Sequence, residues 1–390
     1  MTTAATRCPQ SFEFQAATRL VVGGGSLARV GDLARSLGGT RALLVSDPGL
    51  VATGFPAHAE ELLASAGLAC RLFQEFGENP STAHVEAGLA VAHEFRPDVI
   101  VALGGGSSMD CAKGINFVFS FGGSMHDYHG RGRAGRERGP MLPSIAVPTT
   151  AGTGSETQSF ALISDAHTGA KMACGDPRAA FRMAILDVEL TLTQPDRVTA
   201  LTGVDAVSHA IESFVSRAGT PASRLFAREA WRLLAAHLPR VLANGHDVES
   251  RASVQLAAAW AGVAIENSML GGAHAMANPL TQLYGIPHGQ AVGLALPHVV
   301  GFNASVCEAD YAELCSDLPS AGTNAGSARL ADWLRDLLRQ AGMSGSLTEL
   351  GLANADTAAL AAIGIQQWTG SFNPQPLSDG DFQALYEASR

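Results

Sequence analysis

The chain has little cysteine and no long hydrophobic run. Its six cysteines, spread over 390 residues, include no Cys-x-x-Cys pair, so the sequence indicates neither a disulfide framework nor a zinc knuckle. No stretch reaches the length of about 18 apolar residues that a membrane-spanning helix needs. Residues 1–7 lack the charged and then apolar pattern of a signal peptide. We therefore expect a cytoplasmic protein with no membrane partner.

Positive charge is also scarce. The sequence holds 26 Lys and Arg against 36 Asp and Glu, a formal net charge of −10. Nucleic acids bind to clustered basic residues, so no nucleic-acid partner is expected for this acidic chain. The single basic cluster, at residues 131–139, is broken by glycines, contains an acid and is typical of a solvated loop.

Length and periodicity predict two domains of different classes. In the first half, short apolar runs alternate with helical stretches, which is typical of βαβ units and a parallel sheet. From about residue 190, long stretches of helical period dominate. We predict an α/β nucleotide-binding domain with a parallel sheet at residues 1–189 and an all-helical metal-binding domain at residues 190–390. The expected strands of one sheet are residues 19–22, 41–47, 70–76, 99–103, 144–148, 160–164, 171–174 and 183–186.

A glycine-rich turn follows the most apolar predicted strand. Residues 104–107 read Gly-Gly-Gly-Ser and lead into a predicted helix, an arrangement that lets backbone amides approach a phosphate. The alternative is that these glycines serve only a tight turn. The pattern is not the common dinucleotide fingerprint Gly-x-Gly-x-x-Gly, so we expect a pyrophosphate site of another kind.

Two other predicted strands also end in polar groups, at the same edge of the predicted parallel sheet as the glycine-rich turn. Asp47 closes the predicted strand 41–47, where a carboxylate can accept hydrogen bonds from a ribose diol and repel a 2′-phosphate, which favours NAD over NADP. The turn at residues 149–156 is rich in hydroxyls and glycines and offers donors for phosphate or ribose.

A candidate metal site lies in the helical half. Asp205 and His209 are four residues apart and share one helix face, while His274 and His288 stand among small residues. An isolated Asp-x3-His pair is more often a solvated helix face. We interpret the four side chains together as one divalent-metal site in a partly open coordination shell.

Taken together, these motifs resemble the iron-dependent, or group III, alcohol dehydrogenase family. The resemblance covers nearly the whole chain. Its most specific segments are residues 104–110, 148–156, 202–212 and 287–298.

The resemblance implies roles for individual residues. Asp205, His209, His274 and His288 match the metal ligands, and Asp47 matches the acid that selects NAD. It further implies an active site in the cleft between the domains, and a homodimer. The other implied cofactor contacts are Gly105, Gly106, Ser107 and Asp110 in the first turn, Thr149, Thr150 and Thr153 in the second, and Lys171 at a ribose.

Asn278 departs from the family pattern. The family commonly has a second histidine four residues after the one that His274 matches, and that side chain is often assigned to proton handling beside the nicotinamide and substrate. Asn278 faces the same cleft one helical turn after His274, but an amide cannot titrate. Asn278 is therefore a candidate catalytic residue without an acid or base role, and the usual substrate is in question.

The expected activity is hydride transfer between NAD(H) and a small alcohol, aldehyde or ketone, with the metal polarising the substrate oxygen. Fe²⁺ is the favoured ion, Zn²⁺ is an alternative, and the ligand set also accepts Ni²⁺, Co²⁺ or Mn²⁺. Related activities stay open: polyol dehydrogenase, maleylacetate reductase and hydroxyacid-oxoacid transhydrogenase. Dehydroquinate synthase is disfavoured because the cleft motifs hold no basic cluster. A non-catalytic sensor of NAD or metal is the alternative from another class.

Overall fold

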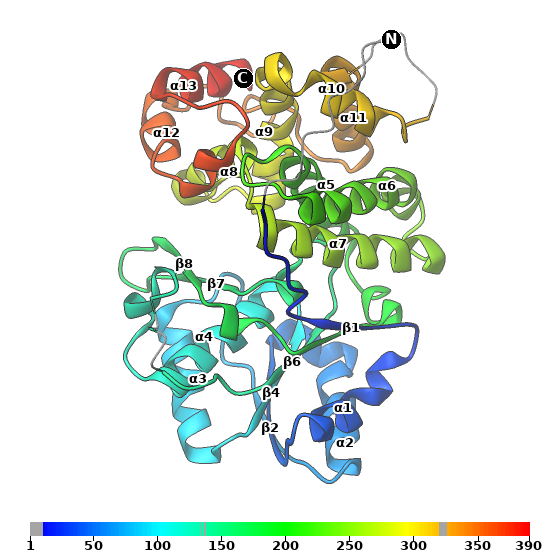
Figure 1. Ribbon diagram of the computed structural model, residues 1–390, viewed down its shortest axis with the longest axis vertical. Helices are drawn as coiled ribbons and strands as arrows, with labels where there is room; N and C mark the ends of the chain where they lie inside the picture. Colours follow the sequence, from blue (N-terminus) through cyan, green and yellow to red (C-terminus); the bar gives the residue numbers. More distant parts are fainter. Residues whose placement is uncertain (1–10, 134, 136–137, 320–325) are drawn as a thin grey trace.

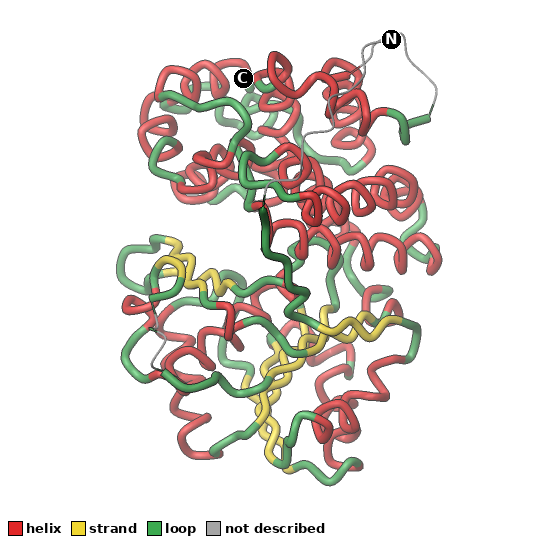
Figure 2. Tube along the Cα trace, viewed as in Figure 1, coloured by secondary structure: helices red, strands yellow, loops and turns green. Residues whose placement is uncertain are grey.

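A computed structural model describes residues 11–133, 135, 138–319 and 326–390 of the chain. The interpretation of residues 1–7 lies outside the described residues, as does that of residues 134, 136 and 137 in the basic cluster. Among the residues so described, strands are confined to the N-terminal half and helices fill the C-terminal half (Figure 2).

A six-stranded parallel sheet forms the centre of the N-terminal half, in the order β1-β9-β6-β4-β2-β3. Apolar side chains on successive residues point to opposite faces, so that both faces need a covering layer. The strands are β1 (Arg19–Val22), β2 (Arg41–Ser46), β3 (Ala69–Phe73), β4 (Val99–Gly104), β6 (Ser144–Pro148) and β9 (Met183–Leu186).

Helices cover both faces of this sheet (Figure 1). Ala42 and Leu44 of β2 pack on the side of α1 (Val30–Ser36) and α2 (Phe55–Ser65). Leu43 and Val45 belong to the core shared with two helices on the opposite face, α3 (Thr82–Phe95) and α4 (Gly106–Phe121). All four strand residues are fully buried, and the predicted α/β fold with a parallel sheet is confirmed.

Two predicted strands do not join the central sheet. β7 (Phe160–Ser164) and β8 (Lys171–Gly175) form an antiparallel pair, to which β5 (Gly130–Arg131) adds a short parallel strand. The prediction that they complete the central sheet is wrong. The turn between β7 and β8 explains the difference, because Asp165 accepts hydrogen bonds from the backbone nitrogens of His167 and Thr168 and closes a hairpin. A hairpin reverses the chain and therefore cannot continue a parallel order.

The C-terminal half is built from helices only, as predicted, among the residues that the structure describes. Its buried centre includes Trp231, whose indole donates to the backbone oxygen of Leu314 at 2.8 Å. The helices are α5 (Asp196–Val215), α6 (Pro221–Ala243), α7 (Val248–Ser268), α8 (Gly272–Tyr284), α9 (His288–Phe302), α10 (Ala304–Cys315), α11 (Gly326–Gln340), α12 (Thr357–Gly364) and α13 (Asp379–Ala388).

Helix α7 lies over the N-terminal half and joins the two halves (Figure 1). Thr157, in the short 3-10 helix η4 (Ser155–Thr157), donates to the backbone oxygen of Ala259 at 3.0 Å. A Cβ on Gly154 would lie only 2.7 Å from the Cα of Gly262, so the two backbones meet without side chains between them. The turn after β6 is thereby fixed against the helical half.

Within the described ranges, no single helix has both the length and the apolar character needed to cross a membrane. One bent pair, α9 with α10, meets that test only when the two helices are joined across a bend of 113°.

Candidate active site between the two halves

Four side chains from three helices converge between the two halves. Asp205 and His209 lie one turn apart on α5, His274 lies in the first turn of α8, and His288 is the first residue of α9. Gly289 permits this approach, because a Cβ there would lie 2.2 Å from the backbone oxygen of Leu201 in α5. All four predicted metal ligands are thus brought to one place.

Three of the donors form a compact group: the ligand atoms of Asp205, His209 and His274 all lie within 4.8 Å of one another. Asp205 Oδ1 lies 3.4 Å from Nε2 of His209 and 3.5 Å from Nε2 of His274. Ligand bonds of about 2.0–2.2 Å put neighbouring donors of a four-coordinate ion roughly 3.3–3.6 Å apart, so this spacing fits a divalent cation. His288 Nε2 lies 3.8 Å from Asp205 Oδ1 and stands outside the compact group, so its place as fourth ligand stays a prediction.

Two buried atoms of this group lack hydrogen-bond partners. Asp205 Oδ1 and His274 Nε2 are fully enclosed, and each such atom costs about 1–3 kcal/mol unless something binds it. Burial acts to raise the pKa of Asp205, but the three imidazoles together hold it below its usual range. Burial also lowers the pKa of His288 to about 3, so its ring is neutral and its nitrogen can act as a ligand. A bound cation would satisfy both orphaned atoms.

Hydrogen bonds behind the imidazoles orient them. The backbone oxygen of Gly152 lies 3.2 Å from His209 Nδ1, and Glu212 Oε2 lies 2.6 Å from His274 Nδ1. Each bond occupies Nδ1 and leaves Nε2 directed at Asp205. The sequence analysis assigned no role to Glu212. Its signal was available, since Glu212 stands seven residues after Asp205 and so faces the same side of the helix.

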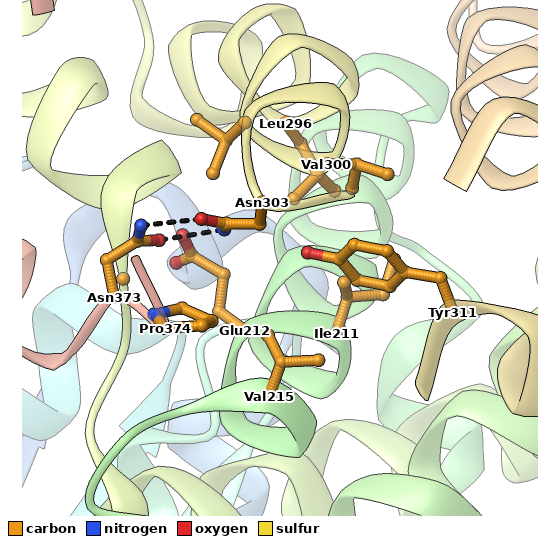
Figure 3. A pocket seen from close by; sticks show the side chains of 11 residues that line it. Ile211, Glu212, Val215, Leu296, Val300, Asn303, Tyr311, Asn373 and Pro374 are labelled. Carbon is orange, nitrogen blue, oxygen red and sulfur yellow. Dashed lines mark hydrogen bonds between the residues drawn. The ribbon is translucent and has the colours of Figure 1, made fainter. Parts of the chain in front are cut away.

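Glu212 is itself held by the start of α8 and by the C-terminal segment. Its Oε1 accepts from the backbone nitrogen of Ala273 at 2.6 Å. Beside it, across a small cavity, the side chains of Asn303 and Asn373 exchange two hydrogen bonds of 3.0 and 2.7 Å (Figure 3). Asn373 also accepts from the backbone nitrogen of Gly272 at 3.2 Å. These bonds fix the helix end that carries His274.

Replacing Glu212 by glutamine is expected to weaken metal binding by about 10- to 100-fold. The carboxylate accepts two hydrogen bonds, from His274 and Ala273, whereas an amide must turn its NH₂ group toward one of these donors. Chelator competition monitored by metal analysis measures the effect. Glu86→Gln, an exposed change on α3, serves as the matched control. Equal affinity in the folded Glu212→Gln variant would show that the carboxylate does not support the site.

The glycine-rich turn lies at the carboxyl edge of the sheet, next to the second polar turn. β4 and β6 are neighbours, and Gly104 pairs with Pro148 where the two strands end. The backbone nitrogen of Thr149 donates to Gly104 at 2.9 Å. The two turns, separated by about 40 residues in the sequence, are therefore adjacent because parallel strands end at the same edge.

Gly105 and Gly106 leave room between these turns. Gly105 precedes α4 without a side-chain cap, which leaves the amides of the first helical turn available to an anion. A Cβ on Gly106 would lie 2.9 Å from Thr153 Cγ2, and one on Gly105 would lie 3.3 Å from Thr150 Cγ2. Ser107 stands in the same first turn of α4, and the glycines of this turn pack against Thr150 and Thr153 of the second.

Asp47 lies at the same edge, one strand away. Its Oδ1 accepts from the backbone nitrogen of Gly49 at 3.0 Å, and Ser108 Oγ donates to its Oδ2 at 3.3 Å. These bonds hold the carboxylate beside the glycine-rich turn, where a Cβ on Gly104 would lie 3.0 Å from Oδ2.

Asp110 and Lys113 lie beneath the turns. Ser155 Oγ donates to Asp110 Oδ1 at 2.9 Å, and the buried ammonium of Lys113 donates to Ser155 and to the backbone oxygen of Phe160. Burial raises the pKa of Asp110. In this arrangement Asp110 braces the second turn from below, and its direct contact with a cofactor stays a prediction.

Lys171 reaches this region from the hairpin rather than from the central sheet. It is the first residue of β8, and the carboxylates of Asp110 and Asp205 are the charges that act on its ammonium. Lys171 is exposed, and its contact with a ribose stays a prediction.

Asn278 lies one turn after His274 on α8 and is half-buried. Its Nδ2 donates to Oε1 of Gln367 at 2.9 Å. The sequence analysis missed Gln367, and no local signal could have found it, because it is 89 residues away and the fold alone brings the two amides together.

The fold and this geometry point to a class of protein: an enzyme with an α/β half whose polar turns could hold a nucleotide and a helical half whose Asp205, His209 and His274 could hold a metal ion. Comparisons with known proteins agree. The family model for iron-containing alcohol dehydrogenase matches residues 17–188, and the model for the C-terminal part of that family matches residues 199–390.

Individual relatives and solved structures match over nearly their full length. The NAD-dependent methanol dehydrogenase of Bacillus methanolicus is 33% identical over 359 residues, 91% of this chain and 93% of that protein. A crystal structure of 1,3-propanediol oxidoreductase is similar with a TM-score of 0.91 at 30% identity, covering 98% of this chain and 100% of that one. The structure of sulfoacetaldehyde reductase from Bifidobacterium kashiwanohense in complex with NAD⁺ is similar with a TM-score of 0.87 at 29% identity. The match covers 97% of this chain and 99% of that one.

The chain belongs to the iron-containing alcohol dehydrogenase family. The predicted family and fold class are therefore confirmed. The predicted activity, metal-dependent hydride transfer between NAD(H) and an alcohol or aldehyde, is confirmed at the level of the family.

Proposed function

We propose that this chain interconverts small alcohols and their aldehydes or ketones at the site formed by Asp205, His209, His274 and His288. The observation that carries the proposal is the convergence of three imidazole Nε2 atoms on a buried Asp205 oxygen that has no hydrogen-bond partner. Gly152 supports a shared reaction centre, because it contacts His209 from the turn that also packs against Gly106.

A divalent ion held by these four side chains would supply a Lewis acid that polarises the substrate oxygen, and NAD would supply the hydride acceptor. Fe²⁺ is the ion we propose, supported by the family, and Zn²⁺ is the alternative for the same ligands. The imidazoles hold the pKa of Asp205 below its usual range, and hydrogen bonds to Nδ1 orient the rings of His209 and His274. Burial lowers the pKa of His274, but Asp205 and Glu212 together raise it to about 9, so a bound ion would displace a proton from its Nε2.

For NAD, we propose that the first turn of α4 binds the pyrophosphate and that Asp47 binds the ribose of the adenosine. The positions of both at one sheet edge support this assignment. The remaining proposed contacts are Gly105, Gly106, Ser107 and Asp110 in the first turn, Thr149, Thr150 and Thr153 in the second, and Lys171 at a ribose.

We further propose a domain boundary at residues 189 and 190, a homodimer, and a cytoplasmic location without nucleic-acid or membrane partners. The boundary is supported by the two family models, which meet between residues 188 and 199. The net charge of −10 supports the proposal that nucleic acid is not a partner.

The test is an absorbance assay of NADH formation. Anaerobically purified protein is supplied with NAD⁺, either Fe²⁺ or Zn²⁺, and a panel of short alcohols, diols and hydroxyacids, and its metal content is measured in parallel. We expect metal-dependent NADH formation with several short alcohols. Bound metal and NAD without turnover of any compound would favour a sensor, and turnover that needs no added NAD would favour a transhydrogenase.

Replacing Asp47 by glycine is expected to raise the ratio of kcat/KM for NADP to that for NAD by at least about tenfold. The change removes a carboxylate that would repel the 2′-phosphate of NADP and would accept hydrogen bonds from the ribose diol of NAD. Steady-state kinetics with both cofactors measures the ratio, and exposed Asp32→Gly on α1 is the control. An unchanged ratio would place the ribose away from Asp47.

A further inference from the structure

The pair formed by Asn278 and Gln367 lies beside the metal ligands without contacting them. Asn278 follows His274 by one turn of α8, so the two side chains lie on the same helix face. Gln367 immediately precedes the 3-10 helix η7 (Trp368–Phe372), which packs against α8. Both residues are half-buried.

The next residue places this pair at the junction of the two halves. The ring of Trp368 lies 5.7 Å from that of Phe160 in β7, and 44% of Trp368 is exposed. In Figure 1 the segment between α12 and α13 accordingly faces β7 and β8 of the nucleotide half. A substrate that enters between the halves passes this edge.

The backbone fixes which way both amides point. Gln367 Nε2 donates to the backbone oxygen of Ile363 at 3.4 Å, and a carbonyl oxygen can only accept. Gln367 Oε1 must therefore face Asn278, and only the NH₂ group of Asn278 can donate to it. These two hydrogen bonds use Nδ2 of Asn278 and turn its Oδ1 away from Gln367.

Asn278 Oδ1 is the atom at the end of this series of hydrogen bonds. It is not among the enclosed atoms without partners, and none of the hydrogen bonds of the described residues involves it. It is thus an oriented acceptor that is not enclosed, one helical turn from the candidate metal ligand His274.

We propose that Asn278 Oδ1, oriented by Gln367 as a positioning residue, selects alcohols that carry a second hydrogen-bond donor, a hydroxyl or an ammonium group, a few bonds from the reacting hydroxyl. The inference rests on the proposed function of the Asp-His₃ site. An acceptor with no titrating proton attracts such donors and repels a carboxylate or sulfonate at the same position.

A matched set of three-carbon substrates tests the selection: 1-propanol, 1,3-propanediol, 3-amino-1-propanol and 3-hydroxypropionate. We expect kcat/KM for the diol and the amino alcohol to exceed that for 1-propanol by about tenfold, the effect of one net hydrogen bond. We expect 3-hydroxypropionate to be the poorest of the set. Equal values for the diol and 1-propanol would overturn the inference and leave the proposed function intact. NADH formation from none of the four would count against the proposed function itself.

Variants of Gln367 separate orientation from mere packing. Gln367→Glu keeps an acceptor facing Asn278, so the preference for the diol over 1-propanol is expected to stay. Gln367→Lys presents a donor, which would turn the Asn278 amide and present its NH₂ group to the substrate. The ratio of kcat/KM for 3-hydroxypropionate to kcat/KM for 1,3-propanediol is then expected to be about tenfold or more higher than in the unmodified enzyme. Gln366→Leu is the control, because this exposed neighbour makes the same kind of bond to the helix and does not touch Asn278.

Binding without turnover gives an independent measurement. Calorimetric dissociation constants for 1,3-propanediol and 1-propanol are measured on the protein with NADH, which cannot oxidise either. The tenfold preference is expected to appear here and to vanish in Asn278→Leu. A preference that persists in Asn278→Leu, or one that Gln367→Lys leaves unchanged while the variant remains folded, would overturn the assignment.

Discussion

His209→Ala is expected to lose its bound metal and to lower kcat by at least about 10³-fold, while NADH binds nearly as before. The change removes one of three nitrogens that converge on Asp205 Oδ1, and a Lewis acid is worth several kcal/mol to such a reaction. The nucleotide turns lie on the other half of the molecule; the second turn loses its contact between Gly152 and His209, while the bond from Thr149 to Gly104 is kept. Metal analysis, steady-state kinetics and fluorescence titration with NADH measure the three quantities.

The control for this variant is His58→Ala, which removes an exposed imidazole of α2 far from the site. It is expected to keep both metal and turnover. Full turnover in a metal-free His209→Ala protein would show that the four side chains are not the reaction centre.

Gly106→Val is expected to give the opposite pattern: metal retained and the dissociation constant for NADH raised by at least about 100-fold, or ~2.7 kcal/mol. A Cβ at this position already lies 2.9 Å from Thr153, and the two added methyl groups fill the space before the first turn of α4. The backbone amides there would no longer reach an anion.

Gly301→Val is the matched control, since it is also a helical glycine but has nothing within 4 Å of an added Cβ. It is expected to leave NADH binding unchanged. His209→Ala and Gly106→Val together test whether the two halves hold separate parts of one site. Tight NADH binding by a folded Gly106→Val protein would place the pyrophosphate elsewhere.

Much of the site was predictable because its parts are local. The spacing of Asp205 and His209 fixes both on one face of a helix, and Gly104 to Gly106 follow a strand that is apolar on both faces. Strand ends in a parallel sheet share an edge, so Asp47 could be placed beside the glycines before the structure was known.

The errors arose where local patterns are ambiguous. The runs that became β7 and β8 are apolar enough for a central strand, and only the turn at Asp165 shows that they form a hairpin. The sequence also does not show that Ser155 covers Asp110, which the fold buries. Periodicity reports which faces are apolar, not which neighbour covers them.

By itself, the sequence determined the class of fold, a parallel α/β half followed by a helical half, because periodicity and residue type are local. It also predicted the candidate metal ligands and the turns at the sheet edge, the former with the help of the family resemblance. Only the tertiary structure decided how Glu212 braces His274, how Gly152 links the metal ligands to the nucleotide turn, and how Gln367 orients Asn278. These three contacts join residues 57 to 89 positions apart, and no local propensity encodes a hydrogen bond between groups that only the packing of helices and turns brings within reach.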